Sequence, residues 1–211
     1  MLSSRSTFPV LLKVAILVAV GAVALCATTP RGWMLGGSKP HDYETGIDDA
    51  QYNGHRIAYL KAVAEAPSGF GTLMQYFRAN RYAGTRVQLR AALKADQVSN
   101  WAGLWMRVDK TAEDTTRVLA FDNMHDRPVN GTTGWRDCQV VLDVPADASN
   151  IYFGVILGGS GQVSISDISI ESVDQDVPVT AAKPVSYFRS HDKLRDFRRP
   201  LETPFNLEFQ P

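Results

Sequence analysis

A run of polar side chains between Trp101 and Trp135 has the residue types that bind a polar ligand. Two carboxylates, an amide, an imidazole and a guanidinium stand close together at Asp122, Asn123, His125, Asp126 and Arg127. Sugars are held by planar hydrogen-bonding groups together with an aromatic ring against their C–H faces. We therefore predict a ligand site that combines this run with side chains from the preceding predicted strand, Trp101, Trp105 and Arg107.

Two other interpretations of the polar run stay open. Asp126, Arg127 and Pro128 are consecutive, so a bidentate contact between the guanidinium and a carboxylate can simply pin a loop. Alternatively, Asp122 and Asp126 could be the paired carboxylates of a glycan hydrolase or lyase, with His125 as a third polar group. Because the two aspartates are four residues apart in a strand-to-loop segment, the sequence gives them no common face, and we predict no catalytic residue.

Asp167 and Glu208 form a second candidate site. Asp167 interrupts the alternation that runs from Val163 to Ile170, which predicts a bulge or an aspartate with a specific task. If the C-terminal segment folds back, Glu208 comes near Asp167, and such carboxylate oxygens suit Ca²⁺. We therefore predict a structural calcium ion there. The four histidines are scattered without H-x-H or H-E-x-x-H spacing, which does not favour a zinc site.

The elements that must position these residues are short strands. Runs rich in Val, Ile, Tyr, Phe and Leu recur after position 30, separated by Gly, Asn, Asp and Pro, and residues 87–94 alternate between apolar and polar. This pattern predicts an all-β fold, a two-sheet antiparallel β-sandwich or jelly roll. The predicted strands are Asp42–Ile47, Arg56–Ala62, Gly71–Arg78, Arg86–Lys94, Ala102–Val108, Arg117–Asn123, Arg136–Val144, Ile151–Leu157 and Gln162–Ser172.

Composition excludes several classes of protein. The 22 basic and 22 acidic side chains give a formal net charge of zero, whereas nucleic-acid binders usually carry a basic excess. We therefore predict no nucleic-acid partner. The sequence has only two cysteines, Cys26 and Cys138, which excludes both a disulfide scaffold and a cysteine-rich metal site.

The two ends of the chain differ from the middle. Val14 to Ala27 carries no charge and follows a basic start, which is the form of a secretory signal. As a helix, these residues span about 21 Å, less than a ~30 Å hydrocarbon core, although residues 8–27 together would suffice for an uncleaved anchor. We predict a hydrophobic N-terminal helix, signal peptide or anchor, in residues 1–27 and the sandwich in 28–173. Residues 174–211 would form an extended C-terminal arm, with a last strand at 205–209.

Several strings in the sequence resemble a bacterial jelly-roll module. They are WMLGGSKPHDYE from Trp33, NGHRIAYL from Asn53, FGTLMQ from Phe70, WAGLWMRVD from Trp101, FDNM from Phe121, DRP from Asp126 and GTT from Gly131. The resemblance covers about residues 32–180. It implies an architecture similar to carbohydrate-binding, galactose-binding-like domains, of the kind appended to helix-turn-helix regulators and to some hydrolases.

One departure from that module concerns its first strand. A strand like NLDFE usually precedes the Gly-Trp pair, and residues 28–31 contain nothing similar. The string Asn206-Leu207-Glu208-Phe209 stands at the other end of the chain. We predict that this segment folds back into the first-strand position, beside residues 162–172.

Taken together, these observations favour an exported, non-catalytic module that binds a carbohydrate or another small polar ligand at the cell envelope. We expect it in the periplasm, or anchored in the inner membrane and facing the periplasm, with the membrane contacted only through residues 8–27. One alternative is an envelope protein that contacts a protein partner through its arm or a sandwich face. The other is an enzyme on a jelly-roll frame that uses Asp122, His125 and Asp126.

Overall fold

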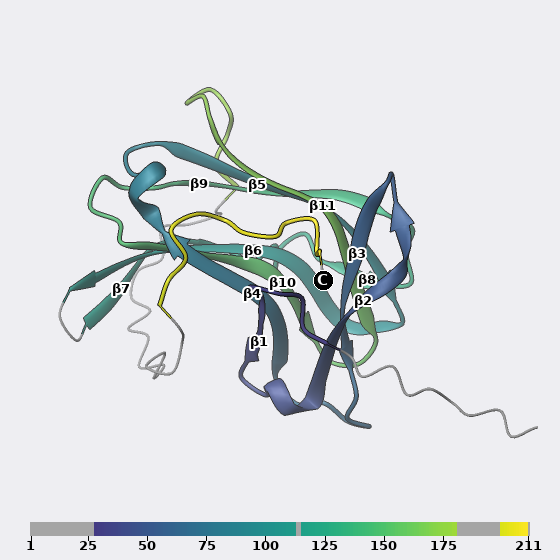
Figure 1. The fold of residues 1–211 in the computed structure, drawn as a ribbon. Coiled ribbons are helices and arrows are strands. Elements are labelled where there is room, and N and C mark those ends of the chain that lie inside the picture. The colour runs from purple at the N-terminus through teal and green to yellow at the C-terminus, as the bar shows by residue number, and fades with distance from the viewer. Residues whose placement is uncertain (1–27, 113–114, 181–198, 211) are drawn as a thin grey trace, which may run out of the picture.

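Two antiparallel sheets pack face to face in a computed structural model that describes residues 28–112, 115–180 and 199–210 (Figure 1). The first sheet has the order β1–β4–β10–β6–β7, with β8 paired to β6, and the second has the order β2–β3–β11–β5–β9. The strands are β1 Met34–Gly37, β2 Tyr43–Tyr52, β3 His55–Ala62, β4 Phe70–Arg78, β5 Arg86–Asp96, β6 Val98–Ala112, β7 Thr115–Asp122, β8 Val129–Gly131, β9 Arg136–Asp143, β10 Asn150–Gly158 and β11 Gln162–Val173. Two 3₁₀ turns, Pro40–Asp42 and Ala79–Arg81, complete the described elements.

The predicted fold class is confirmed, and each of the nine predicted strands is present with shifted ends. The sequence pattern missed β1 and β8, which are four and three residues long, too short to show a period of two. The predicted N-terminal helix lies outside the described residues. Among the residues that the structure does describe, no helix is long and apolar enough to cross a membrane.

Alternation along each strand divides the side chains between the core and an outer face. In β10, Ile151, Phe153, Val155 and Leu157 point inward and are wholly buried. They lie opposite inward residues of β4 and β6, for instance Phe77 beside Ile151. Burial of each such side chain contributes roughly 1.5–3 kcal/mol, so this shared interior fixes which side chains of the central strands face outward.

The irregularity predicted at Asp167 is a bulge. The register between β11 and β5 shifts between Ser166 and Ser169, and Asp167 has a φ of 50°. Aspartate tolerates this left-handed conformation better than most residues because its short side chain bonds locally. The extra residue turns the Asp167 side chain outward from the sheet, toward the neighbouring hairpin β2–β3.

The C-terminal segment does return to the sandwich, but the predicted strand at residues 205–209 is absent. Figure 1 shows this segment, in yellow, lying along one side between the two layers. It begins with a parallel bridge from Leu201 to Phe77 of β4 and therefore borders the first sheet, not β11. Positive φ values at Asn206 and Phe209, both 51°, turn the backbone and prevent a strand.

A buried glutamine explains why this segment is held. Gln75 is inward-facing on β4 and wholly buried, so its amide needs hydrogen-bond partners within the protein. The Gln75 Nε2 donates to the carbonyl of Phe205 at 2.7 Å, and its Oε1 accepts from the N–H of Phe205 at 2.7 Å. The side-chain amide thus pairs with one residue of the C-terminal segment as a neighbouring strand would.

Phe209 anchors the end of the segment in the core. Its side chain has no exposed surface and packs 5.2 Å from the ring of Trp33, between ring centroids. The indole N–H of Trp33 in turn donates to the carbonyl of Asn206 at 3.0 Å. Residues before β1 and residues at the C-terminal end therefore close the same side of the sandwich.

Replacement of Phe209 by alanine should lower the free energy of unfolding by about 3–5 kcal/mol, because it empties a wholly buried site. Phe205→Ala is the matched control: this phenylalanine is 41% exposed, and we expect a loss of about 1 kcal/mol. Urea denaturation of the full chain measures both values. Equal, small losses would show that the segment is not part of the folded core.

Candidate functional site

The outer side of the first sheet carries an aromatic surface. The side chains are those that alternate outward on β1, β4, β10, β6 and β7, and they form a second apolar cluster separate from the core. We call this surface the outer aromatic face. It consists of Met34, Phe70, Met74, Tyr76, Trp101, Trp105, Phe121, Tyr152 and Ile156.

Two glycines of β10 lie opposite the tryptophans of β6. In the register, Gly154 lies opposite Trp105 and Gly158 opposite Trp101. A Cβ at Gly158 would lie 2.8 Å from Nε1 of Trp101, and one at Gly154 would lie 2.1 Å from the carbonyl oxygen of Leu73. Neither position accepts a side chain: the indole of Trp101 lies against the backbone of β10 at Gly158, and the backbone of β4 approaches closely at Gly154.

Trp105 is held in place by a hydrogen bond across the sheet. Its Nε1 donates to Oγ1 of Thr72 on β4 at 2.8 Å, which carries the indole across β10. The Thr72 hydroxyl in turn donates to the carbonyl of Val155 at 2.9 Å. Trp105 is 7% exposed and forms part of the floor of the face, whereas Trp101 is only half-buried.

A cation lies at the other end of the face. The rings of Tyr76 and Tyr152 stack with centroids 4.9 Å apart, and the guanidinium of Arg107 lies 4.6 Å from the centroid of Tyr152. Nη2 of Arg107 is 3.0 Å from Oδ2 of Asp109, an aspartate with no exposed surface. Burial raises the pKa of Asp109 to about 6, against the opposing effect of Arg107.

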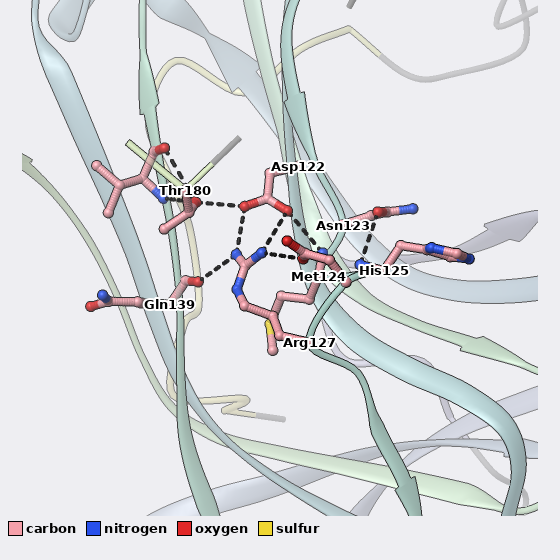
Figure 2. Close-up of polar contacts among 9 residues, drawn as sticks. Asp122, Asn123, Met124, His125, Arg127, Gln139 and Thr180 are labelled. Carbon is pink, nitrogen blue, oxygen red and sulfur yellow. Dashed lines mark hydrogen bonds and ion pairs between the residues drawn. The ribbon is translucent and has the colours of Figure 1, made fainter. Parts of the chain in front are cut away.

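The predicted polar run separates into two groups (Figure 2). Asp122 and Arg127 form a bidentate ion pair, and Arg127 also donates to Asp126 at 2.8 Å. Asp122 is buried because it pairs with Met106, an inward position of β6. Neither its side chain nor that of Arg127 belongs to the outer aromatic face.

The ion pair joins the two sheets at their edges. Arg127 donates to the carbonyl of Gln139 on β9 at 3.2 Å, and the hydroxyl of Thr180 donates to Asp122 at 2.5 Å. Thr180 also accepts from the N–H of Val141 on β9. The edge strand β7 of one sheet is therefore fastened to the edge strand β9 of the other, which matches the loop-pinning interpretation of these residues.

Asn123 and His125 point away from the ion pair, as Figure 2 shows. The imidazole of His125 lies edge-to-face with Trp101, with ring centroids 5.6 Å apart. Asn123 accepts the N–H of His125 with its Oδ1, at 3.2 Å. These two residues thus border the half-buried end of the outer aromatic face, together with Trp101.

Asp167 and Glu208 do come close together, with a histidine between them. Nδ1 of His55 is 2.8 Å from Glu208, and its Nε2 is 3.6 Å from Asp167. The hydrogen bond to Glu208 raises the pKa of His55. Among the described residues, no group of three or more His, Cys, Asp or Glu side chains is placed to hold a metal ion. A calcium ion at Asp167 and Glu208 stays a prediction.

Sequence reasoning missed Tyr76, Tyr152 and Asp109 as members of this region. All three follow from alternation once one outward residue is known. Asp109 is two residues from Arg107 on β6, and Tyr152 pairs with Arg107 in the register. The period of two shows which side chains of one strand share a face. Only the pairing of distant strands shows which of these side chains are neighbours across the sheet.

The sandwich and its outer aromatic face define the class of protein as an all-β, jelly-roll-type domain. No family model matches the chain. It is 45% identical over 152 residues to the uncharacterized HTH-type transcriptional regulator YbfP of Bacillus subtilis. The match covers 71% of this chain and 50% of that protein, so the chain spans about half the length of this relative.

Solved structures with a similar fold include three carbohydrate-binding modules. A family 30 module has a TM-score of 0.49 and 16% identity, and the match covers 70% of this chain and 95% of that one. The C-terminal family 22 module of Clostridium thermocellum Xyn10B has a TM-score of 0.48 and 11% identity, with 67% of this chain and 86% of that one covered. The xylan-binding domain of Paenibacillus barcinonensis Xyn10C has a TM-score of 0.47 and 13% identity, with 70% of this chain and 89% of that one covered. At these scores and identities the likenesses establish no shared ligand.

The two aspartates of the polar run should differ in their effect on stability. Asp122→Ala breaks a largely buried ion pair and the link between the sheet edges, and we expect a loss of about 2–3 kcal/mol because Arg127 is partly solvated. Asp126→Ala removes a carboxylate that is 59% exposed, with an expected loss below about 1 kcal/mol. Thermal unfolding of both variants compares them. A larger loss in the Asp126 variant would contradict the structural role of Asp122.

Proposed function

We propose that this chain is a non-catalytic binding module, and that it binds a carbohydrate or another small polar ligand on the outer aromatic face. The observation that carries the proposal is the placement of two indoles opposite the glycines of β10, on a face that also carries a partly exposed guanidinium. Sugar rings present flat C–H faces to such aromatic surfaces and hydroxyls to neighbouring polar groups. The outer aromatic face is mostly apolar with a few fixed polar groups, which is the usual composition of a ligand site.

The half-buried end of the face offers the first contacts. Trp101 has no hydrogen-bond acceptor for its indole N–H within the described residues, and Asn123 uses only its Oδ1 there. His125 is exposed beside them. A ligand that stacks on Trp101 therefore meets one indole donor, one amide and one imidazole, while Trp105 forms the adjoining floor of the face.

The positions of the carboxylates favour binding over catalysis. Asp122 would have to act with Asp126 if the chain were a glycan hydrolase of the kind considered above. Asp122 instead accepts hydrogen bonds from Arg127, Thr180 and the N–H of Met124. Asp126 also contacts Arg127, so the pair supports a loop and not a reaction.

Export is the second part of the proposal, and it rests on the uncharged stretch from Val14 to Ala27. Fractionation of bacterial cells that produce the full chain should place it in the periplasm or the inner membrane. Protease added to spheroplasts should then digest the sandwich. Recovery in the cytoplasm, protected from protease, would overturn this part of the proposal.

Ligand binding is tested by a thermal-shift screen of the full chain against neutral and acidic polysaccharides. A ligand at 100 times its dissociation constant should stabilise the native state by about 2.7 kcal/mol. Trp101→Ala should remove the shift. The matched control is Trp135→Ala, since Trp135 is also half-buried but stacks on Tyr52, 4.4 Å away, from the other sheet.

In this screen, no shift with any polysaccharide would reject carbohydrate binding and favour a protein partner. A shift that survives in Trp101→Ala but disappears in Trp135→Ala would place the ligand elsewhere on the molecule. Both variants must retain the melting transition of the unmodified chain without ligand, which separates lost binding from lost folding.

A further inference from the structure

We propose that the outer aromatic face selects anionic polysaccharides, and that a proton on Asp109 strengthens this selection by releasing the charge of Arg107. The inference rests on the proposed binding function and specifies its ligand class and its regulation. Its basis is the arrangement of one cation, one hidden carboxylate and two stacked tyrosines at the end of the face opposite Trp101.

Arg107 is placed to meet a ligand. It stands in one cross-strand row with Tyr76, Tyr152 and Phe121, all on outward positions. Its side chain keeps 17% of its surface exposed, and its guanidinium lies over the ring of Tyr152. A ligand ring that follows the aromatic face therefore reaches a guanidinium at its edge, and a guanidinium pairs well with carboxylate or sulfate oxygens.

Asp109 opposes that contact when it is ionised. Its carboxylate lies 3.0 Å from Nη2 of Arg107, so the two charges cancel at the face. An anionic ligand must then compete with a carboxylate that is already in place. When Asp109 is protonated, the opposing charge is gone and Arg107 presents a full positive charge to the ligand.

The surroundings of Asp109 favour the protonated form of its carboxyl group over the ionised form. The side chain is wholly buried, and apart from the contact with Arg107 its oxygens have no hydrogen-bond partner among the described residues, where Nε of Arg107 also lacks an acceptor. A buried carboxylate that lacks hydrogen bonds is costly in its charged form. The pKa of about 6 reflects this cost and places the change of charge in an accessible range of pH.

Other titratable groups near the pair do not replace Asp109 in this role. Tyr152 on β10 has its pKa raised to about 12 by burial and by Asp109, so it stays neutral. On β4, burial raises the pKa of Tyr76 as well. The charged neighbours Arg78 and Lys110 are engaged by Glu202 and Asp147, and β7 places the apolar Val118 opposite Asp109.

The size of the effect follows from the fraction of molecules in which Asp109 is protonated. With a pKa of about 6, this fraction falls from about nine-tenths at pH 5 to a few hundredths at pH 7.5. If only the protonated form binds the anion, the apparent affinity falls by up to about 30-fold over this interval. Uronic acids and sulfate esters remain ionised throughout, so the ligand itself contributes little to this change.

The test uses two charged polymers with uncharged counterparts: polygalacturonate with its methyl ester, and dextran sulfate with dextran. Affinities for the full chain are measured at pH 5 and pH 7.5 with a chelator present. We expect at least one charged polymer to bind more tightly than its counterpart, and about 10- to 30-fold more tightly at pH 5 than at pH 7.5.

Substitutions at Arg107 and Asp109 test whether these two residues cause the pH-dependent preference for charged polymers. In a His125→Gln background, which removes the histidine at the other end of the face, Asp109→Asn should bind the charged polymer equally at both pH values, near the tighter affinity. Arg107→Gln should abolish the preference for charge, so that the affinity for the charged polymer falls to that for its uncharged counterpart at both pH values. Asp147→Asn is the matched control, because Asp147 is an exposed aspartate paired with Lys110. This variant should keep the full pH dependence.

The outcomes separate this inference from the function on which it rests. Binding of neutral polysaccharides with no preference for either charged polymer would overturn the inference and leave the binding module intact. A preference for charge that is independent of pH in the unmodified chain, or a pH dependence that persists unchanged in Asp109→Asn, would overturn the role of Asp109. Absence of binding to every polysaccharide, neutral or charged, would reject the proposed function itself.

Discussion

Closure of the open sides of the sandwich is the constraint on which the rest of this structure depends. Two stacked sheets leave unpaired edges where polar backbone and apolar core both meet solvent. On one side the ion pair of Asp122 and Arg127, extended by Thr180, fastens β7 to β9. On the other side, the C-terminal segment pairs with Gln75 and fills the core with Phe209.

The contacts that close the sandwich determine which polar residues are available to contact a ligand. The guanidinium of Arg127 donates hydrogen bonds to Asp122, Asp126 and the backbone carbonyl of Gln139, and these bonds fix it at the edge of the sandwich. The same turn directs Asn123 and His125 to the opposite side, beside Trp101. One short loop therefore has both a structural role and a place at the candidate site, and its members divide according to the face that each reaches.

The sequence was sufficient for the parts of the fold that depend on local period. Alternation located nine strands and the irregularity at Asp167, which is a bulge. It could not divide the polar run, because the partners that fix Asp122 and Arg127, Thr180 and Gln139, are distant in the chain. The segment from Phe205 to Phe209 alternates like a strand, yet hydrogen bonds to Gln75 and Trp33 hold it in a turned conformation that no local pattern indicates.

The outer aromatic face departs from what stability alone would favour, and this is the strongest physical argument for its having a function. Glycine within a strand costs roughly 0.5–1 kcal/mol relative to alanine, and β10 has glycine both at its centre and at its end, beside the two indoles. The buried pair of Arg107 and Asp109 adds a further cost, since an apolar pair of similar size would avoid the unpaired oxygens. The face thus combines aromatic rings packed against glycine backbone with a titratable charge at one end, which suits a flat, polar ligand.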